Sequence, residues 1–244
     1  MQLNRFLFLV GMAAMIALLT GCLYPQDRLQ HNQVPYLDQL EAVQSSVNQF
    51  QEANGGLLPI KDRDMETPIY QKYPIDFNKL SPRYLQDPPG TAYESGGVYL
   101  YVLVDVEENP TVKLIDLRIA EQIRDLNMRI SVYKSSNGFA PVKEVINAHA
   151  FRVDWEKLGY SEEPYVESPY SDKNLPLILN DKAELQVDYS ADLYEFLQKH
   201  EHKFKEGEDI RDILVENSVF VPAFSSPYTL DENNEPIITK LDNN

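Results

Sequence analysis

Two carboxylates in matching contexts are the first candidates for chemistry. Asp76 lies in Ile-Asp-Phe-Asn-Lys-Leu, and Asp154 lies in Val-Asp-Trp-Glu-Lys-Leu. Paired carboxylates can act as acid and base in hydrolysis. Asp is also a preferred N-cap, because its side chain accepts a hydrogen bond from the backbone at the start of a helix. We expect both acids to cap a short turn and the neighbouring Phe77 and Trp155 to be core anchors, with hydrolysis as the alternative.

Nucleophiles with a placed base are scarce. The chain has four histidines and one cysteine, and it lacks a Gly-x-Ser-x-Gly elbow, a His-Glu-x-x-His pair and a Gly-rich phosphate loop. A serine triad needs a positioned base such as histidine. We therefore expect the protein not to be an enzyme.

Metal ligands are considered at three places. Residues 200–202 read His-Glu-His, but residues i and i+2 of a helix do not face each other, and a structural zinc site needs several converging ligands. The oxygen-rich turns Asp105–Asn109 and Asp231–Glu235 lack the central Gly and final Glu of an EF-hand loop. Asp and Asn favour turns for local reasons. We expect a solvated helix end, two plain turns and no cofactor, with calcium at either turn as the alternative.

Aromatic rings in loops are a further candidate. Tyr84, Tyr93, Tyr165 and Tyr170 all lie near prolines. Such rings can stack on sugars, but they more often pack within their own loops. We expect packing, with a glycan site as the alternative.

The single cysteine ends an apolar N-terminal segment. Arg5 is the only charged residue before position 27, and the apolar run that follows it ends in Leu19-Thr20-Gly21-Cys22. A positive start, a short apolar core and small residues before a cut site are typical of a secretory signal. The run is shorter than the ~20 residues that a membrane-spanning helix needs. The four residues that end in Cys22 resemble the lipobox of bacterial lipoproteins.

The lipobox resemblance implies cleavage between Gly21 and Cys22. It also implies a diacylglyceryl group on the Cys22 sulfur and an acyl chain such as palmitate on the new N-terminus. Two or more chains anchor a protein stably to a bilayer. We therefore expect a lipid-anchored protein on the extracytoplasmic face of the cell membrane.

The charge of the mature chain limits its partners. Residues 1–21 carry one Arg and no acid, so removing them leaves 21 basic and 38 acidic residues, a formal charge of −17. Nucleic-acid binding needs a basic face, and anionic headgroups repel such a surface. We expect no nucleic-acid partner, and an extracytoplasmic protein as the possible partner.

An internal repeat organises the chain after a tether at residues 22–34. We expect a first repeat over 35–115, a second over 116–189, and a C-terminal helix and hairpin over 190–240. Each repeat has a helix, a stop at Asn-Gly, a segment with Pro, the Asp/Lys/Leu motif and two strands. The second copy follows by 83 residues at the Asn-Gly helix stop, from Asn54 to Asn137, and by 78 at the Asp/Lys/Leu motif, from Asp76 to Asp154. Helices followed by antiparallel hairpins predict an α+β fold.

Helix faces follow from the spacing of apolar residues. The expected helices are 35–53, one centred on 119–133, 191–203 with Ser190 as its cap, and a short one near 209–215. The expected strands are 98–104, 111–115, 175–179 and 184–189, and a final hairpin pairs 218–224 with 236–240. The expected buried faces are Leu37, Leu40, Val43, Val47 and Phe50 in the first helix, and Ile119, Ile123, Leu126, Ile130 and Tyr133 in the second.

Two family resemblances follow from these motifs. Residues 37–115 have a long helix, Asn-Gly-Gly-Leu-Leu-Pro, Lys-Leu-Ser-Pro-x-Tyr-Leu and Pro-Pro-Gly before a hairpin, which resembles the globular part of type II secretion pseudopilins. The lipobox departs from pseudopilins, which keep their apolar stretch as an assembly helix. The whole chain resembles the YphF-type lipoproteins of Bacillus and its relatives, which implies a Gram-positive cell membrane and no particular activity.

Three functions remain open on this basis. A membrane-tethered protein-interaction module fits the lipobox, the tether and the repeat. An envelope hydrolase that uses Asp76 or Asp154 is the first alternative. A transporter-associated binding lipoprotein is the second, but such proteins usually have repeated β-α-β units, which the pattern here does not predict.

Overall fold

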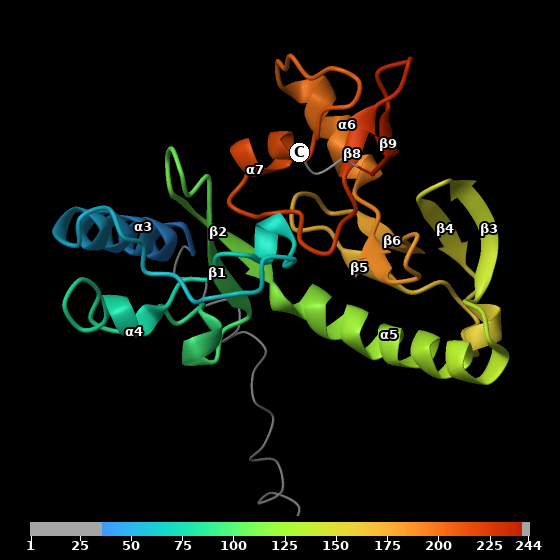
Figure 1. Ribbon diagram of the computed structural model, residues 1–244, viewed down its shortest axis with the longest axis horizontal. Coiled ribbons are helices and arrows are strands. Elements are labelled where there is room, and N and C mark those ends of the chain that lie inside the picture. Colours follow the sequence, from blue (N-terminus) through green and yellow to red (C-terminus); the bar gives the residue numbers. More distant parts are fainter. Residues whose placement is uncertain (1–35, 241–244) are drawn as a thin grey trace, which may run out of the picture. The chain divides into compact units, whose positions relative to one another are not determined.

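A helix followed by an antiparallel hairpin occurs twice along the chain (Figure 1). The structure is a computed structural model, and it describes residues 36–240. The helices are α3 (Tyr36–Ala53), α4 (Phe77–Leu80), α5 (Leu117–Asn137), α6 (Ser190–Lys199) and α7 (Asp212–Glu216). Short 3-10 turns are η1 (Ile69–Gln71), η2 (Tyr93–Ser95) and η3 (Glu156–Leu158). The fold is α+β, as the sequence predicts.

The strands of the described residues pair antiparallel in separate sheets. They are β1 (Tyr99–Val104), β2 (Thr111–Asp116), β3 (Val142–Asn147), β4 (Ala150–Val153), β5 (Tyr165–Glu167), β6 (Asn174–Leu179), β7 (Leu185–Val187), β8 (Tyr228–Leu230) and β9 (Pro236–Ile238). One hairpin is β1–β2 and another is β8–β9. The larger sheet has the order β3-β4-β6-β5, and β7 also pairs with β6.

Helix α3 is fixed to the β1–β2 hairpin by one glutamine. The Gln44 side chain accepts from Val112 N at 2.7 Å and donates to Pro110 O at 3.0 Å. Val43 and Val47, on the inner face of α3, are fully buried, as expected from their spacing. Leu37 was expected on the same face, but it is 47% exposed. Leu37 lies in the first turn of α3.

Helix α5 has a buried face that matches its apolar spacing. Ile119, Ile123, Leu126 and Ile130 are at most 6% exposed and belong to the main core, which also contains strands β4, β6 and β7. The Asp116 carboxylate caps the helix by accepting from Arg118 N at 2.9 Å.

The two helices of the repeat end in the same way. The Asn54 side chain donates to Phe50 O at 2.7 Å, and the Asn137 side chain donates to Tyr133 O at 2.9 Å. A glycine with positive φ follows each asparagine, as expected where a helix ends in a left-handed residue. The Asn-Gly motif therefore has the same backbone role in both copies.

The segment after each helix also repeats its hydrogen bonds. Asp76 N donates to Pro59 O at 2.7 Å, and Asp154 N donates to Pro141 O at 2.7 Å. Each bond joins the Pro-containing segment to the Asp/Lys/Leu motif. The shared sequence pattern thus corresponds to shared backbone contacts, although the loops between the motifs differ in length.

The second copy has strands that the sequence analysis did not predict. Strands β3 and β4 form a hairpin, and β5 pairs antiparallel with residues 174–176 of β6. Four consecutive residues of β3 are exposed, and its register with β4 shifts twice. A strand without alternation of buried and exposed residues leaves no period-two signal in the sequence.

The predicted final hairpin is wrong in its first strand. Residues 218–224 do not pair with β9, which instead pairs with β8. Phe220 lies beside β2 in a parallel bridge with Leu114, where Leu114 N donates to Val219 O at 2.9 Å and Val221 N donates to Leu114 O at 3.1 Å. The apolar run was recognised, but its partner lies about a hundred residues earlier, beyond the reach of local pattern.

Helix α6 also differs from its prediction. It ends at Lys199 rather than near residue 203, and His200 has an extended backbone. Ser190 is the first helical residue and not the cap, and its N–H donates to the Asp188 carboxylate at 2.9 Å. The side-chain acceptor at the start of this helix is therefore the Asp188 carboxylate and not the predicted Ser190 hydroxyl.

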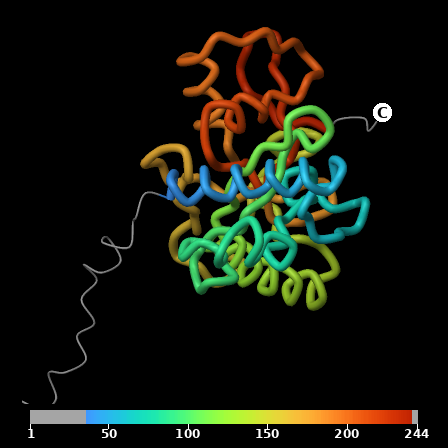
Figure 2. The backbone as a smooth tube through the Cα atoms, turned by 90° about the vertical axis from the view of Figure 1, so that its left-hand side faces the viewer, coloured from blue at the N-terminus to red at the C-terminus, as the bar shows by residue number. Residues whose placement is uncertain are grey.

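The C-terminal segment, residues 209–240, contacts both repeats. It reaches the first through Phe220, and the second where Val187 N donates to Phe224 O at 2.7 Å and the Tyr189 hydroxyl donates to Ala223 O at 3.2 Å. Residues from Leu40 onward form one compact unit. Figure 2 shows this segment, in orange and red, beside the green β1–β2 hairpin.

Candidate functional site

A cleft of about 1400 Å³ opens on the surface of the described residues. Its walls come from three parts of the chain: the loop 65–73 with the end of β1–β2, the β6–β7 turn, and the C-terminal segment. A second, smaller cavity of about 560 Å³ lies along α5 and β5. The larger cleft is the candidate site, because both repeats and the C-terminal segment contribute to it.

Equivalent hairpin turns of the two repeats line this cleft. The β1–β2 turn contributes Asp105, Glu107 and Glu108, and the β6–β7 turn contributes Asp181 and Glu184. Both turns contain a residue with positive φ, at 49° for Asp105 and 57° for Ala183. A left-handed residue reverses the chain in a short distance, and it leaves the acidic side chains of each turn exposed.

A buried tyrosine and a buried arginine form one wall. Tyr70, 6% exposed, donates its hydroxyl to the Asp212 carboxylate at 2.9 Å, and the Arg211 guanidinium lies 5.0 Å from its ring centroid. Arg211 is 7% exposed and makes a two-point pair with Asp209, with a shortest distance of 2.6 Å. Its remaining amino group donates to Ser225 O at 3.1 Å and to Ser225 Oγ at 3.0 Å.

Burial dominates the protonation of this wall. Burial raises the pKa of the Tyr70 hydroxyl well above its usual range, so this group is a hydrogen-bond donor rather than a base. Desolvation by the surrounding protein raises the pKa of the Asp212 carboxyl, and the Asp212 side chain is still exposed to the cleft. Burial opposes the charge of Arg211, but the Asp209 carboxylate keeps its pKa raised. The cluster therefore holds the wall together.

Lys113 on β2 joins the hairpin to the end of α7. Its ammonium donates to Val215 O at 2.5 Å and to Ser218 O at 2.6 Å. Burial lowers its pKa. Since a helix end leaves carbonyls without partners, this lysine supplies donors that the chain itself lacks there.

Both repeated acids accept a hydrogen bond from the turn that follows, but only Asp76 is the N-cap of its turn, because the N-cap of η3 is Trp155. Asp76 accepts from Asn78 N at 3.2 Å. Asp154 accepts from Lys157 N at 3.4 Å and pairs with its ammonium at 2.7 Å, and these contacts lower the pKa of Asp154. Phe77 and Trp155 are 3% and 4% exposed, which confirms them as core residues. Neither acid lines the cleft.

The histidine-rich stretch is not helical, contrary to expectation. His200 lies 5.4 Å from the Phe196 ring and His202 stacks on Phe204 at 5.7 Å. Because α6 ends before these residues, the helical-spacing argument against chelation does not apply. Within residues 36–240, no three His, Cys, Asp or Glu side chains are grouped so that they could hold a metal ion.

The two oxygen-rich turns have different surroundings. Asp231 closes the β8–β9 turn by accepting from Asn233 N and Glu235 N, both at 2.8 Å, and these bonds lower its pKa. Its role there is that of a turn residue. The Asp105–Asn109 turn lines the cleft.

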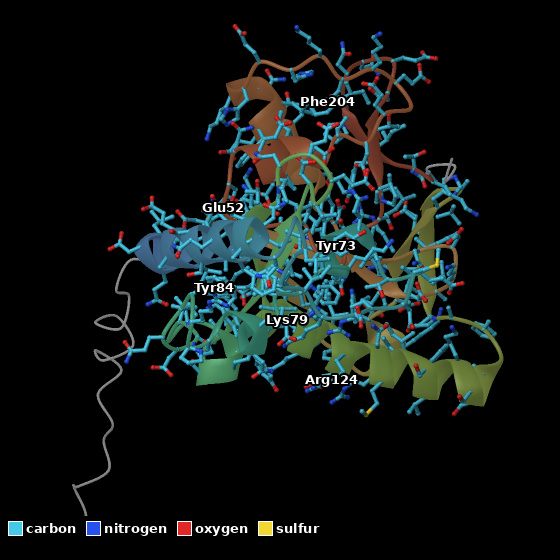
Figure 3. All side chains as sticks on the ribbon, turned by 60° about the vertical axis from the view of Figure 1, so that its left-hand side comes forward. Glu52, Tyr73, Lys79, Tyr84, Arg124 and Phe204 are labelled. Carbon is cyan, nitrogen blue, oxygen red and sulfur yellow. The ribbon has the colours of Figure 1, made fainter. Side chains whose placement is uncertain are left out.

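The loop tyrosines fall into two groups. Tyr84 packs edge-on against Phe50 at 5.5 Å and Tyr170 against Tyr189 at 5.7 Å, in agreement with a packing role. Figure 3 shows Tyr84 between α3 and α4. Tyr93 and Tyr165 are 64% and 50% exposed, and neither lines the larger cleft.

The predicted lipid site lies outside the described residues. Cys22 and Gly21 both precede residue 36, so cleavage and acylation there stay predictions. Within residues 36–240, no helix has the length and apolar character needed to cross a bilayer.

Comparison with known proteins gives one family. Residues 36–116 match the YphF family N-terminal domain. The match spans α3, α4 and the β1–β2 hairpin, and it supports a relationship to a YphF-like family. No curated protein and no solved structure matches the chain. The likeness to pseudopilins stays a prediction.

The cleft itself was missed by the sequence analysis. The sequence indicates a role for Asp105, Glu107 and Glu108 only as calcium ligands, and it indicates no binding role for Asp181 or Glu184. The available signal was that both repeats place acids between their two strands. Recognising one shared site would have required knowledge of how the repeats pack.

Proposed function

We propose that the protein is a lipid-anchored, extracytoplasmic interaction module that docks a partner protein in the larger cleft. The observation that carries the docking role is the cleft itself, whose volume of about 1400 Å³ is lined by three separate parts of the chain. Small-molecule pockets are usually about 300–1,000 Å³, so an open cleft of this size favours a polypeptide.

Exposed apolar side chains support the same role. Met65 is 89% exposed and Ile69 is 62% exposed, and both line the cleft. Apolar groups that remain in water next to a concave, polar-rimmed surface are typical of interaction sites. The wall behind them is held by the Tyr70–Asp212 contact, so the surface is presented by a fixed part of the fold.

The location follows from the lipobox and is tested at Cys22. Cys22→Ser removes the thiol that would accept the diacylglyceryl group. We expect the variant to leave the membrane fraction or to keep residues 1–21, as measured by fractionation and mass spectrometry. Normal cleavage and membrane retention of this variant would refute the anchor.

Docking is tested by photo-crosslinking in living cells. A photoreactive amino acid at Met65 or Ile69 is expected to join the same partner, identified by mass spectrometry. The control position is Arg124, which Figure 3 shows on the outer side of α5 and which is exposed. Crosslinks of equal yield and identity at Arg124, or none at either cleft position, would contradict docking in the cleft.

A further inference from the structure

The lining of the cleft has an excess of negative charge. Nine acidic and five basic side chains line it. Two of the basic groups, Arg211 and Lys113, are occupied by Asp209 and by the carbonyls of residues 215 and 218. With the Arg211–Asp209 pair set aside, eight acidic and four basic side chains remain, so the lining is acidic.

The acids of the hairpin turns have one cation within their own turns, Lys182, which also lines the cleft. Among residues 36–240, no Lys, Arg or His forms an ion pair with any acid of the two turns. These acids are Asp105, Glu107, Glu108, Asp181 and Glu184. Like charges that face a common space repel one another and raise the negative potential there. A cationic occupant would relieve this repulsion.

We infer that the cleft binds an extended, basic segment of the partner protein, with lysine or arginine side chains alternating with apolar ones. This inference rests on the proposed docking function and names the chemistry of the partner. The two acidic turns supply the charge complementarity, and Met65 and Ile69 supply the apolar contact. Complementary charge mainly sets specificity and the rate of encounter, whereas buried apolar contact contributes most of the affinity.

The arrangement of the walls favours an extended segment. The acids come from turns of two different repeats, and the apolar pair comes from a third loop. A polypeptide that runs past both turns can contact all three, whereas a single small cation would satisfy only one. Within residues 36–240, the lack of a grouped set of metal ligands agrees with this choice.

The test uses a capped synthetic peptide of alternating lysine and leucine, titrated against the mature protein by calorimetry. The comparison peptides alternate glutamate with leucine, or lysine with serine. We expect binding of the lysine–leucine peptide, weakening as salt rises, no binding of the glutamate peptide, and at least about tenfold weaker binding of the lysine–serine peptide.

The matched variants separate a cleft from a generally acidic surface. The first is Glu107→Gln, Glu108→Gln, Asp181→Asn and Glu184→Gln together. The control is Glu41→Gln, Glu52→Gln, Glu121→Gln and Glu201→Gln, all exposed, outside the cleft and removing the same charge. We expect the first to weaken binding about tenfold or more and the control to change it less than about twofold. Equal effects would overturn the inference.

The crosslinking experiment distinguishes this inference from the docking function. If the cleft variant loses the crosslink at Met65 and the captured partner peptide is rich in Lys or Arg, both the docking function and the basic partner are supported. If the crosslink persists in the cleft variant, or the captured segment is acidic, docking stands and the basic partner is refuted. If no partner is captured at Met65 in the unaltered protein, docking itself fails.

Discussion

The hydroxyl of Tyr70 donates to the Asp212 carboxylate at 2.9 Å, although the two residues are 142 positions apart. Tyr70 lies in the first repeat and Asp212 begins α7. Around this contact lies a small second core that contains Val102, Val215 and Val221. This hydrogen bond is thus one of the contacts that tie the first repeat to the C-terminal segment, and it lies at the wall of the cleft.

Tyr70→Phe tests this tie. The ring and its contact with Arg211 remain, but Asp212 loses its donor, so we expect the free energy of unfolding to fall by about 1–2 kcal/mol. Urea denaturation measures the change. Tyr194→Phe is the control, because Tyr194 is 49% exposed, and its effect should stay within about 0.5 kcal/mol. Equal stability of the two variants would show that the hydrogen bond contributes nothing.

Local pattern predicted the parts of the fold that depend on local contacts. The buried face of α5, the helix stops and the cap at Asp76 were recognised because each is formed by residues a few positions apart. The pairing of Phe220 with Leu114 was not, because an apolar run does not encode which strand it joins. The cleft depends on such distant pairings, so its residues were visible in the sequence but their convergence was not.

Lys113→Met tests the second tie between β2 and the C-terminal segment. The methionine keeps most of the apolar stem but removes the donor to Val215 O and Ser218 O. Carbonyls left without a partner should lower the free energy of unfolding by about 1–3 kcal/mol. We also expect faster proteolysis within residues 217–227, because the segment opens more readily.

Lys143→Met is the matched control for that variant. Lys143 is exposed and lies 3.4 Å from Glu163. Exposed pairs of this kind contribute at most about 1 kcal/mol, and proteolysis of the C-terminal segment should not change. A Lys113→Met variant that resists protease like the unaltered protein would contradict the anchoring role.

Asp76 separates capping from catalysis. Asp76→Ala removes the acceptor for Asn78 N and should lower the free energy of unfolding by about 1 kcal/mol. Asp76→Asn keeps an acceptor and should recover most of that loss, whereas a catalytic carboxylate would not tolerate the amide. Thermal denaturation measures stability, and the Met65 crosslink measures function. Loss of the crosslink in a stable Asp76→Asn variant would contradict a purely structural role.

Glu195 on α6 gives a prediction about pH. Hydrogen bonds from Lys173, at 2.5 Å, and from Lys199 lower the pKa of its carboxyl from 4.5 to about 2. Because the folded state favours the ionised form, the stabilisation is present above pH 4.5 and is lost as the pH falls from 4.5 toward about 2.

Glu195→Gln should therefore lower the melting temperature at neutral pH, and its difference from the unaltered protein should shrink as the solution is acidified. Glu201→Gln, at an exposed position, is the control and should follow the unaltered protein. A melting-temperature difference for Glu195→Gln that stays constant across this range would mean that the two lysines do not stabilise the carboxylate in solution.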